Sequence, residues 1–290
     1  MEEKQSCSSA SVSTLEVSDT PTISVVIPTR NEAQNLRHVL PYLPSSVTEV
    51  ILVDGHSIDD TIVEAQRLLP SIKIIEQVGK GKGDALRTGF AVCTSDIIVM
   101  LDADGSTDPA EIPRFIEVLL QGNDFAKGSR FIKGGGSHDI TPLRYWGNTM
   151  LSILVNILFR TTFSDLCYGY NAFWKYCLDH VVVDCDGFEV ETAINLRMHR
   201  AKLKMIEVPS FEHARIHGQS NLRTLRDGWR VLQTIVRERM RRDIKTSGQV
   251  QDKQSGQTQV QSPRGFSYSL ARSLLHFDIS IQISVKKRAV

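Results

Sequence analysis

The feature that most constrains this chain is an apolar run that ends in two carboxylates, Ile97-Ile-Val-Met-Leu-Asp-Ala-Asp-Gly105. An unbroken apolar run of this length is typical of a strand buried on both faces of a sheet. Asp102 and Asp104 follow directly, so we expect them at the carboxyl end of that strand, where open α/β sheets bind ligands. Two such carboxylates can share one divalent cation, and the cation can hold a diphosphate. The segment therefore predicts a site for a metal-bound nucleotide.

Strand-like and helix-like segments alternate along the first hundred residues. This order predicts an α/β protein with a parallel sheet wrapped by helices. Asp54 ends the second expected strand, and Asp102 follows the fourth. The two side chains therefore lie close together if these strands lie near each other in the sheet. We expect strands over 23–28, 49–54, 73–76 and 97–101, and helices over 31–43, 59–69 and 84–93, with Asn31 as an N-cap.

The second half of the chain has a less regular pattern, and its flanks set the domain limits. Residues 1–20 are Ser-rich and aperiodic, which favours a disordered tail, and residues 243–290 read as a polar linker and a tail of unknown structure. A single catalytic domain is therefore expected over 21–242. Within it we expect helices at 109–120, 148–159, 193–199 and 226–240, and strands at 124–129 and 204–208.

Composition excludes some classes of protein. The 290 residues carry a formal net charge of +1, so no global field favours nucleic acid. No run reaches the ~18 apolar residues of a transmembrane helix. The five cysteines have no paired metal-binding spacing and no signal peptide precedes them, which fits a reducing compartment. We therefore expect a cytoplasmic protein that binds no nucleic acid.

Several other side chains have chemistry that suits a nucleotide. Asp54 could accept hydrogen bonds from a base or a ribose, or it could simply form the turn before a helix. Lys80 and Lys82, between glycines, fit a phosphate contact or a solvated basic turn, and the P-loop pattern is absent. Arg130 follows an expected strand, and arginine suits bidentate phosphate contact. Further candidates of this kind are Arg144 and Arg215.

Taken together, these motifs occur in the order seen in a known family. They are Ile23-Ser-Val-Val-Ile-Pro-Thr-Arg-Asn-Glu32, Val53-Asp-Gly-His-Ser-Ile-Asp-Asp60, Gly81-Lys-Gly83, Asp102-Ala-Asp104, Gly128-Ser-Arg130, Ser164-Asp-Leu166 and Gly218-Gln-Ser-Asn-Leu222. Over residues 22–240 the chain resembles family 2 glycosyltransferases, and within them most the dolichyl- or polyprenyl-phosphate sugar synthases. The resemblance implies a GT-A fold, with a Rossmann-like, mostly parallel sheet flanked by helices.

The resemblance also implies a role for each matching residue. The nucleoside pocket would be lined by Pro28, Glu32 and Asp54. The metal, Mg²⁺ or Mn²⁺, would be bound by Asp102 and Asp104, and the donor diphosphate by Asp102, Ala103 and Asp104. Phosphate oxygens would be held by Arg130 and Arg215, and an acceptor phosphate by Arg144. The catalytic set would be Asp104, Asp165 and Arg130.

The implied reaction is a metal-dependent, inverting transfer of a sugar from a UDP- or GDP-linked donor, with polyprenyl phosphate as the favoured acceptor. A hydroxyl acceptor needs a general base, whereas a phosphate monoester, with a second pKa near ~6, is already largely anionic. Asp165 could be that base, a positioning residue or a helix cap. A soluble acceptor is an alternative. So is a non-catalytic nucleotide-sugar-binding protein, because Gly55 and Ser106 stand where relatives often carry a second aspartate and a metal ligand.

The expected helix at 148–159 is apolar around almost its whole circumference. It fits either a core helix or an interfacial element that meets a lipid chain or a bilayer. Arg144, Tyr145 and Trp146 precede it and are residue types found at headgroup level. The last helix, with arginines at 230, 237, 239, 241 and 242, would suit an anionic membrane surface or be a solvated face. These features favour a peripheral position on the inner face of the membrane.

Overall fold

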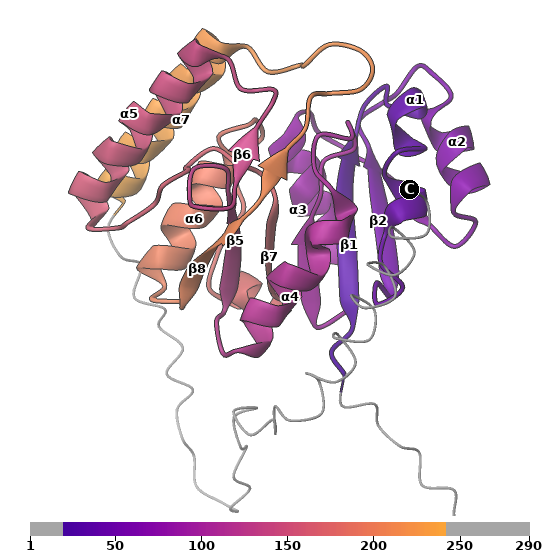
Figure 1. Cartoon of the computed structure of the whole chain (residues 1–290), viewed down its shortest axis with the longest axis horizontal. Helices are drawn as coiled ribbons and strands as arrows, with labels where there is room; N and C mark the ends of the chain where they lie inside the picture. The colour runs from indigo at the N-terminus through magenta and orange to yellow at the C-terminus, as the bar shows by residue number, and fades with distance from the viewer. Residues whose placement is uncertain (1–19, 242–290) are drawn as a thin grey trace, which may run out of the picture.

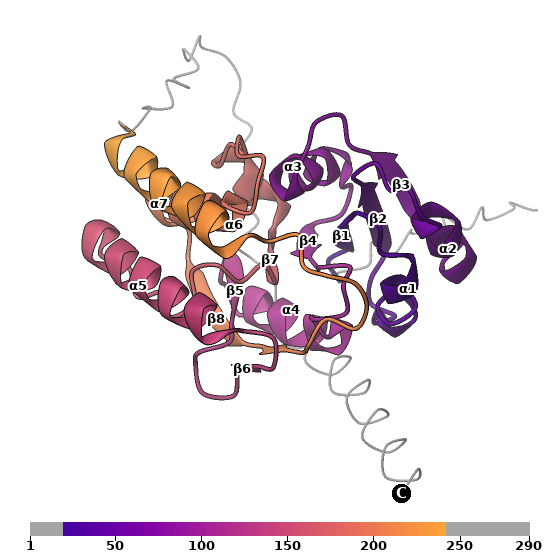
Figure 2. The ribbon, with the colours of Figure 1, turned by 90° about the horizontal axis from the view of Figure 1, so that it is seen from above.

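The computed structural model describes residues 20–241, and the expected terminal tails lie outside this part apart from residue 20. Its centre is a sheet of seven strands in the order β3-β2-β1-β4-β7-β5-β8, with helices on both faces (Figures 1 and 2). The strands are β1 (Ile23–Thr29), β2 (Glu49–Asp54), β3 (Lys73–Glu76), β4 (Ile97–Met100), β5 (Phe125–Ser129), β7 (Asn171–Trp174) and β8 (Met205–Pro209). This confirms the mixed α/β architecture.

Alternating side chains of the buried strands enter two separate cores. Val25 and Ile27 of β1 pack with α1 (Ala33–Leu36), α2 (Thr61–Leu68) and α4 (Ile112–Leu120), whereas Val26 packs with α3 (Lys82–Val92) and α6 (Val190–Arg200). Because both faces are covered, the strands are apolar throughout rather than alternating. The short helices η1 (Leu40–Tyr42), η2 (Pro109–Glu111) and η3 (Lys175–Asp179) complete the layers.

The pairing of β1 brings the two acidic strand ends together. β1 lies between β2 and β4 and is parallel to both, with Thr29 opposite Asp54 and Val26 opposite Met100. The carboxyl ends of the three strands therefore meet at one edge of the sheet, as the sequence predicted. This edge is at the top in Figure 1, where the segment between β9 (Phe211–Glu212) and α7 (Thr224–Met240) passes above it.

Strand β7 was missed by the sequence analysis. It is antiparallel to β4 and β5, with Met100 opposite Asn171 and Phe125 opposite Phe173. β7 is as short as β3 and β4, but it lies outside the regular strand–helix alternation from which those two strands were predicted. A second, two-stranded sheet of β6 (Gly136–Ser137) and β9 was also missed, because each of its strands has only two residues.

The helix expected over 31–43 is wrong in extent and in its cap. Asn31 has a φ of 58°, so it is not helical, and its side chain accepts a hydrogen bond from the backbone N of Ile58 at 2.8 Å. It therefore fastens the loop after β2 instead of capping α1, which has only four residues. Pro41 then starts a separate 3-10 turn.

Helix α5 (Pro142–Phe159) begins six residues earlier than expected and is not a core helix. Thr141 caps it by accepting from the backbone N of Arg144. α5 packs beside α7, and the two share a small core with α6 (Figure 2). Large apolar side chains remain exposed on α5 and α7: Leu143, Trp146, Met150, Ile153 and Ile157, then Leu225, Trp229, Val236 and Met240.

We predict that Gly89→Ala destabilises the protein by about 1–3 kcal/mol, because a Cβ there would lie 2.4 Å from Val26 Cγ1 at the contact between α3 and β1. The matched control is Gly228→Ala in α7, where a Cβ meets nothing within 4 Å. That control is expected to be neutral or up to ~1 kcal/mol more stable. Urea unfolding measures both, and equal stability of the two variants would contradict the close packing of α3.

Candidate active site

The two aspartates of the Asp102-Ala-Asp104 motif lie just beyond β4 and are partly open. Their side chains are 30% and 24% exposed. Asp104 Oδ1 accepts hydrogen bonds from the backbone N of Ser106 at 3.0 Å and from its Oγ at 2.6 Å. Gly105 has a φ of 76°, which turns the chain back so that these bonds can form. Ser106 therefore orients Asp104.

Lys82 connects Asp102 to a carboxylate that the sequence analysis did not select. Its Nζ lies 2.6 Å from Asp102 Oδ1 and 2.8 Å from Oε1 of Glu191, in the first turn of α6. Burial raises the pKa of Glu191, and the charge of Lys82 opposes this effect. The ion pairs outweigh the burial of Lys82 and raise its pKa. Glu191 lies 89 residues from Asp102, so no local spacing could have revealed it.

Arg215 makes the equivalent connection for Asp104. Its Nη1 lies 3.2 Å from Asp104 Oδ2, and its Nη2 pairs with Glu32 after β1. Burial raises the pKa of Glu32, against the effects of Asn35 and Arg215. The Asn35 side chain accepts from the backbone N of His217 at 3.0 Å, which fastens the segment that carries Arg215 onto α1. The structure thus brings together three of the predicted site residues.

The charges of this cluster suit a divalent cation. Four carboxylates, from Glu32, Asp102, Asp104 and Glu191, share two cationic side chains, so the formal charge is −2. Carboxylate oxygen is the ligand type preferred by Mg²⁺ and Mn²⁺. Across residues 20–241 there is no group of three or more His, Cys, Asp or Glu side chains arranged to hold a metal.

Asp54 offers an unused acceptor at the same edge of the sheet. The residue is buried, and its Oδ2 accepts from the backbone N of Ser57 at 2.9 Å. Its Oδ1 is buried without a hydrogen-bond partner in the described part of the chain. Such an orphaned acceptor is costly unless a ligand or water supplies a donor. Pro28 lies on β1 opposite Val53, one residue before the pair of Thr29 and Asp54.

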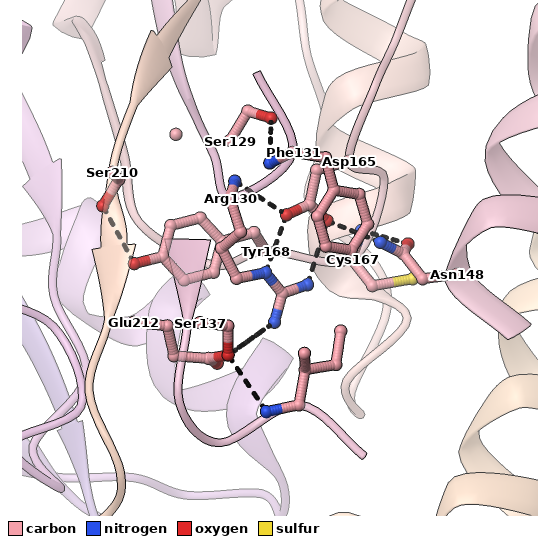
Figure 3. A network of polar contacts seen from close by, with 12 residues as sticks. Ser129, Arg130, Phe131, Ser137, Asn148, Asp165, Cys167, Tyr168, Ser210 and Glu212 are labelled. Carbon is pink, nitrogen blue, oxygen red and sulfur yellow. Dashed lines mark hydrogen bonds and ion pairs between the residues drawn. The ribbon is translucent and has the colours of Figure 1, made fainter. Parts of the chain in front are cut away.

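Arg130 is buried in a network of its own, beyond β5 (Figure 3). Its Nε donates to Asp165 Oδ2 at 2.7 Å, its Nη2 to Asp165 Oδ1 at 2.9 Å, and its Nη1 to Glu212 Oε2 at 3.0 Å. The ring of Tyr168 lies 4.7 Å from the guanidinium carbon. Arg130 is therefore engaged by two carboxylates, of which sequence reasoning had selected only Asp165.

Asp165 is fully buried and its oxygens are occupied. Besides Arg130, it accepts from Asn148 Nδ2 at 2.7 Å. Burial alone would raise the pKa of Asp165, but the hydrogen bonds and charge of Arg130 outweigh it and hold the pKa below its usual value. Arg144 lies apart from this network, at the start of α5, where its Nη1 pairs with Asp139 at 2.9 Å.

The strand order and the flanking helices define a domain of the GT-A fold. The chain belongs to glycosyl transferase family 2, whose family model matches residues 24–182. It is 30% identical over 211 residues to the dolichol-phosphate mannosyltransferase of Pyrococcus furiosus, covering 69% of this chain and 59% of the relative. It is 28% identical over 211 residues to the glycosyltransferase AglJ of Haloferax volcanii, covering 71% and 68%. The chain thus spans about three fifths of the length of the Pyrococcus relative.

Solved structures share the fold at lower identity. Glucosyl-3-phosphoglycerate synthase from Mycobacterium tuberculosis, in complex with Mn²⁺, UDP and glucosyl-3-phosphoglycerate, matches with a TM-score of 0.61 and 23% identity, covering 75% of this chain and 80% of that one. The same enzyme with Mn²⁺, UDP-glucose and phosphoglyceric acid matches with a TM-score of 0.62 and 22% identity, covering 76% and 80%. At this level of identity the likeness concerns the fold.

We predict that Asp165→Asn lowers the free energy of unfolding at neutral pH by about 3–5 kcal/mol, because it leaves the buried Arg130 undercompensated. The pKa of Asp165 is lower in the folded protein than in the unfolded chain, where it is ~3.9. The ionised carboxylate therefore stabilises the fold fully above pH ~3.9, and this stabilisation is lost as the pH falls through the pKa of the folded state. The stability gap between parent and variant should therefore narrow as pH falls below ~4. Urea unfolding across pH tests this, and a gap independent of pH contradicts it.

Proposed function

We propose that the protein is a metal-dependent, inverting glycosyltransferase that moves a hexose from a UDP- or GDP-linked donor to a polyprenyl phosphate. The observation that carries the proposal is the placement of Asp54, Asp102 and Asp104 at the carboxyl ends of β2 and β4, the two parallel neighbours of β1. Lys82 and Arg215 lie beside Asp102 and Asp104. Membership of family 2 supports the transfer, and the name of the Pyrococcus relative supports the acceptor.

The donor would lie across the edge formed by β2, β1 and β4. Asp54 Oδ1 would accept from an N–H of the base or a ribose hydroxyl, which gives a partner to a buried acceptor that lacks one. Pro28 and Glu32 would line the nucleoside pocket beside it. Asp102, Ala103 and Asp104 would lie along the diphosphate.

Asp102 and Asp104 would hold a divalent metal, Mg²⁺ or Mn²⁺, and the −2 charge of the cluster fits that charge. The metal would supply charge neutralisation for the leaving nucleoside diphosphate. Lys82 and Arg215 lie against these aspartates and would contact the phosphate oxygens, where negative charge develops as the glycosidic bond breaks.

The acceptor would be positioned rather than deprotonated. A phosphate monoester is already anionic near neutral pH, so no general base is needed. Asp165 is enclosed by Arg130 and Asn148, and we assign it the positioning role: it holds Arg130 in place beside β5. Arg144 would contact the acceptor phosphate from the start of α5. Arg130 would contribute its charge to phosphate oxygens from inside the network.

The exposed apolar side chains of α5 and α7 would form a membrane-contact surface. On α5 they recur at spacings of three and four residues, from Leu143 to Ile157, so they occupy one helix face. Trp146 and Trp229 are suited to the headgroup region, and the arginines of α7 to anionic lipid. No helix within residues 20–241 is long and apolar enough to cross a membrane. We propose peripheral attachment to the cytoplasmic face.

The function is tested by incubating the full chain with a radiolabelled nucleotide sugar, polyprenyl phosphate and Mn²⁺, then extracting with organic solvent. Label should enter the organic phase in the presence of metal and stay out of it with EDTA. UDP- and GDP-linked donors are compared in parallel. Label found only in a water-soluble product would exclude polyprenyl phosphate as the acceptor. No transfer of sugar from any donor would contradict the proposed transferase activity.

We predict that Asp104→Asn lowers donor turnover by about a hundredfold or more, because it removes one of the two carboxylates facing the diphosphate. The matched control is Asp60→Asn, which removes an equal charge from an exposed position at the start of α2 and should keep parental turnover. Both variants should unfold at the parental temperature. Turnover by Asp104→Asn near the parental rate would exclude the proposed role of this residue.

We predict that Trp146→Glu weakens binding to vesicles containing phosphatidylglycerol by about tenfold or more, since it replaces a 65% exposed aromatic ring on α5 by a charge. Val63→Glu makes a comparable change on α2, where the side chain is 64% exposed but lies outside the proposed surface. Vesicle sedimentation measures both. Equal loss in the two variants would count against a surface on α5.

A further inference from the structure

A cavity of about 860 Å³ lies between the loop before α3, the segment 184–189 and α7. Lys80 and Gly81 line it, whereas Lys82 of the same loop points to Asp102 in the candidate active site. The other candidate active-site residues do not line it. It is therefore a separate cavity that adjoins the donor site through the loop 79–83.

The loop and the segment behind it are packed closely, backbone against backbone. The backbone N of Gly83 donates to the carbonyl oxygen of Asp186 at 2.9 Å. A Cβ at Gly81 would lie 2.2 Å from that same oxygen, and one at Gly83 would lie 2.0 Å from the carbonyl oxygen of Cys185. This side of the cavity is thus a built wall rather than a loose surface loop.

The opposite wall is one face of α7 and is strongly basic. Arg226, Arg230 and Arg237 follow one another at helical spacings of four and seven residues, so they project from the same face. Arg226 and Arg237 form no ion pair with the described residues. Arg230 reaches a carboxylate, Asp227, only at 3.9 Å. Thr234 and Gln233 add polar groups between them.

The carboxylates that line the cavity are largely engaged elsewhere. Asp184 pairs with Arg197 at 2.6 Å and with Arg241 at 3.4 Å, and neither of these arginines lines the cavity. Asp186 lies 3.3 Å from Arg87. Glu189 is the remaining lining carboxylate, and its Oε1 accepts from the backbone N of Gly187 at 3.3 Å. The cavity therefore has an excess of positive charge facing its interior.

We propose that this cavity binds a phosphate group, presented either by a free phosphate compound or by the headgroup of an anionic lipid. A phosphate monoester carries close to two negative charges at neutral pH, so the four cationic side chains that line the cavity would attract it. Guanidinium groups bind phosphate oxygens through paired N–H donors, and three of them converge here with Lys80. The inference does not rest on the proposed transferase activity, because it involves none of the residues assigned to the donor.

The test uses the full-length protein in EDTA, so that no metal assists binding at Asp102 and Asp104. Inorganic phosphate is titrated against the melting temperature at constant ionic strength, and binding to phosphatidylglycerol vesicles is measured by sedimentation. The cavity variant is Arg230→Gln/Arg237→Gln. Its matched control is Arg67→Gln/Arg114→Gln, which removes the same charge from exposed positions on α2 and α4, outside both the cavity and α7.

We expect at least one of the two ligands to bind parent and control alike, and the cavity variant to lose about tenfold or more of that affinity. Lys80→Gln, in an exposed loop position, should weaken binding of the same ligand without changing α7. If the cavity variant loses affinity only for inorganic phosphate, the ligand is a free phosphate compound. If it loses affinity only for the vesicles, the ligand is a lipid headgroup. Equal weakening in both double variants, undiminished binding by the cavity variant, or no binding by the parent overturns the proposal.

Discussion

The parallel pairing of β1 with β2 and β4 is the constraint on which the candidate site depends. Backbone hydrogen bonds fix the register, so Asp54 and the residues after Met100 reach the same edge whatever their side chains do. A shift in register by one residue would move each side chain of these strands into the opposite core, where its packing partners differ, and is therefore disfavoured. Packing of the core therefore positions the acidic side chains, and no direct contact between them is needed to bring them together.

A second level of organisation is electrostatic. Bringing four carboxylates together at the edge of a sheet is unfavourable unless cations accompany them. Lys82 and Arg215 supply that compensation, and they come from opposite ends of the domain, one before β4 and one after β9. The site therefore exists only when both halves of the chain are folded. The same holds for Arg130, whose two carboxylate partners are 35 and 82 residues away.

The sequence was sufficient to predict those parts of the structure that are controlled locally. Buried parallel strands leave long apolar runs, and the carboxylates at their ends are visible in the sequence, so the α/β class and the Asp102-Ala-Asp104 motif could be predicted. β7 and β9 were missed because they are short and lie in the irregular second half of the chain, where no strand–helix alternation marks them as it marked β3 and β4. Asn31 was taken for a helix cap because a side chain that bonds to a distant loop looks the same in sequence as one that bonds to its own helix.

Glu191 and Glu212 were missed for a different reason. Each acts through a partner far away in the chain, and nothing in the flanking residues marks it as an ion-pair member. Arg130 and Asp165 were selected individually, but sequence could not show that they satisfy each other. A residue type shows from the sequence which groups it can bind. Only the structure shows which partner it does bind.

The network around Arg130 has a consequence for how the chain can be divided. The segment matched by the family model ends at residue 182, before β8, β9 and Glu212. A fragment cut there would lose the strand that covers the outer edge of β5 and would leave the Arg130 guanidinium short of one carboxylate. Such a truncated fragment would present an open strand edge to other molecules, so aggregation rather than an autonomous minimal enzyme is its expected fate.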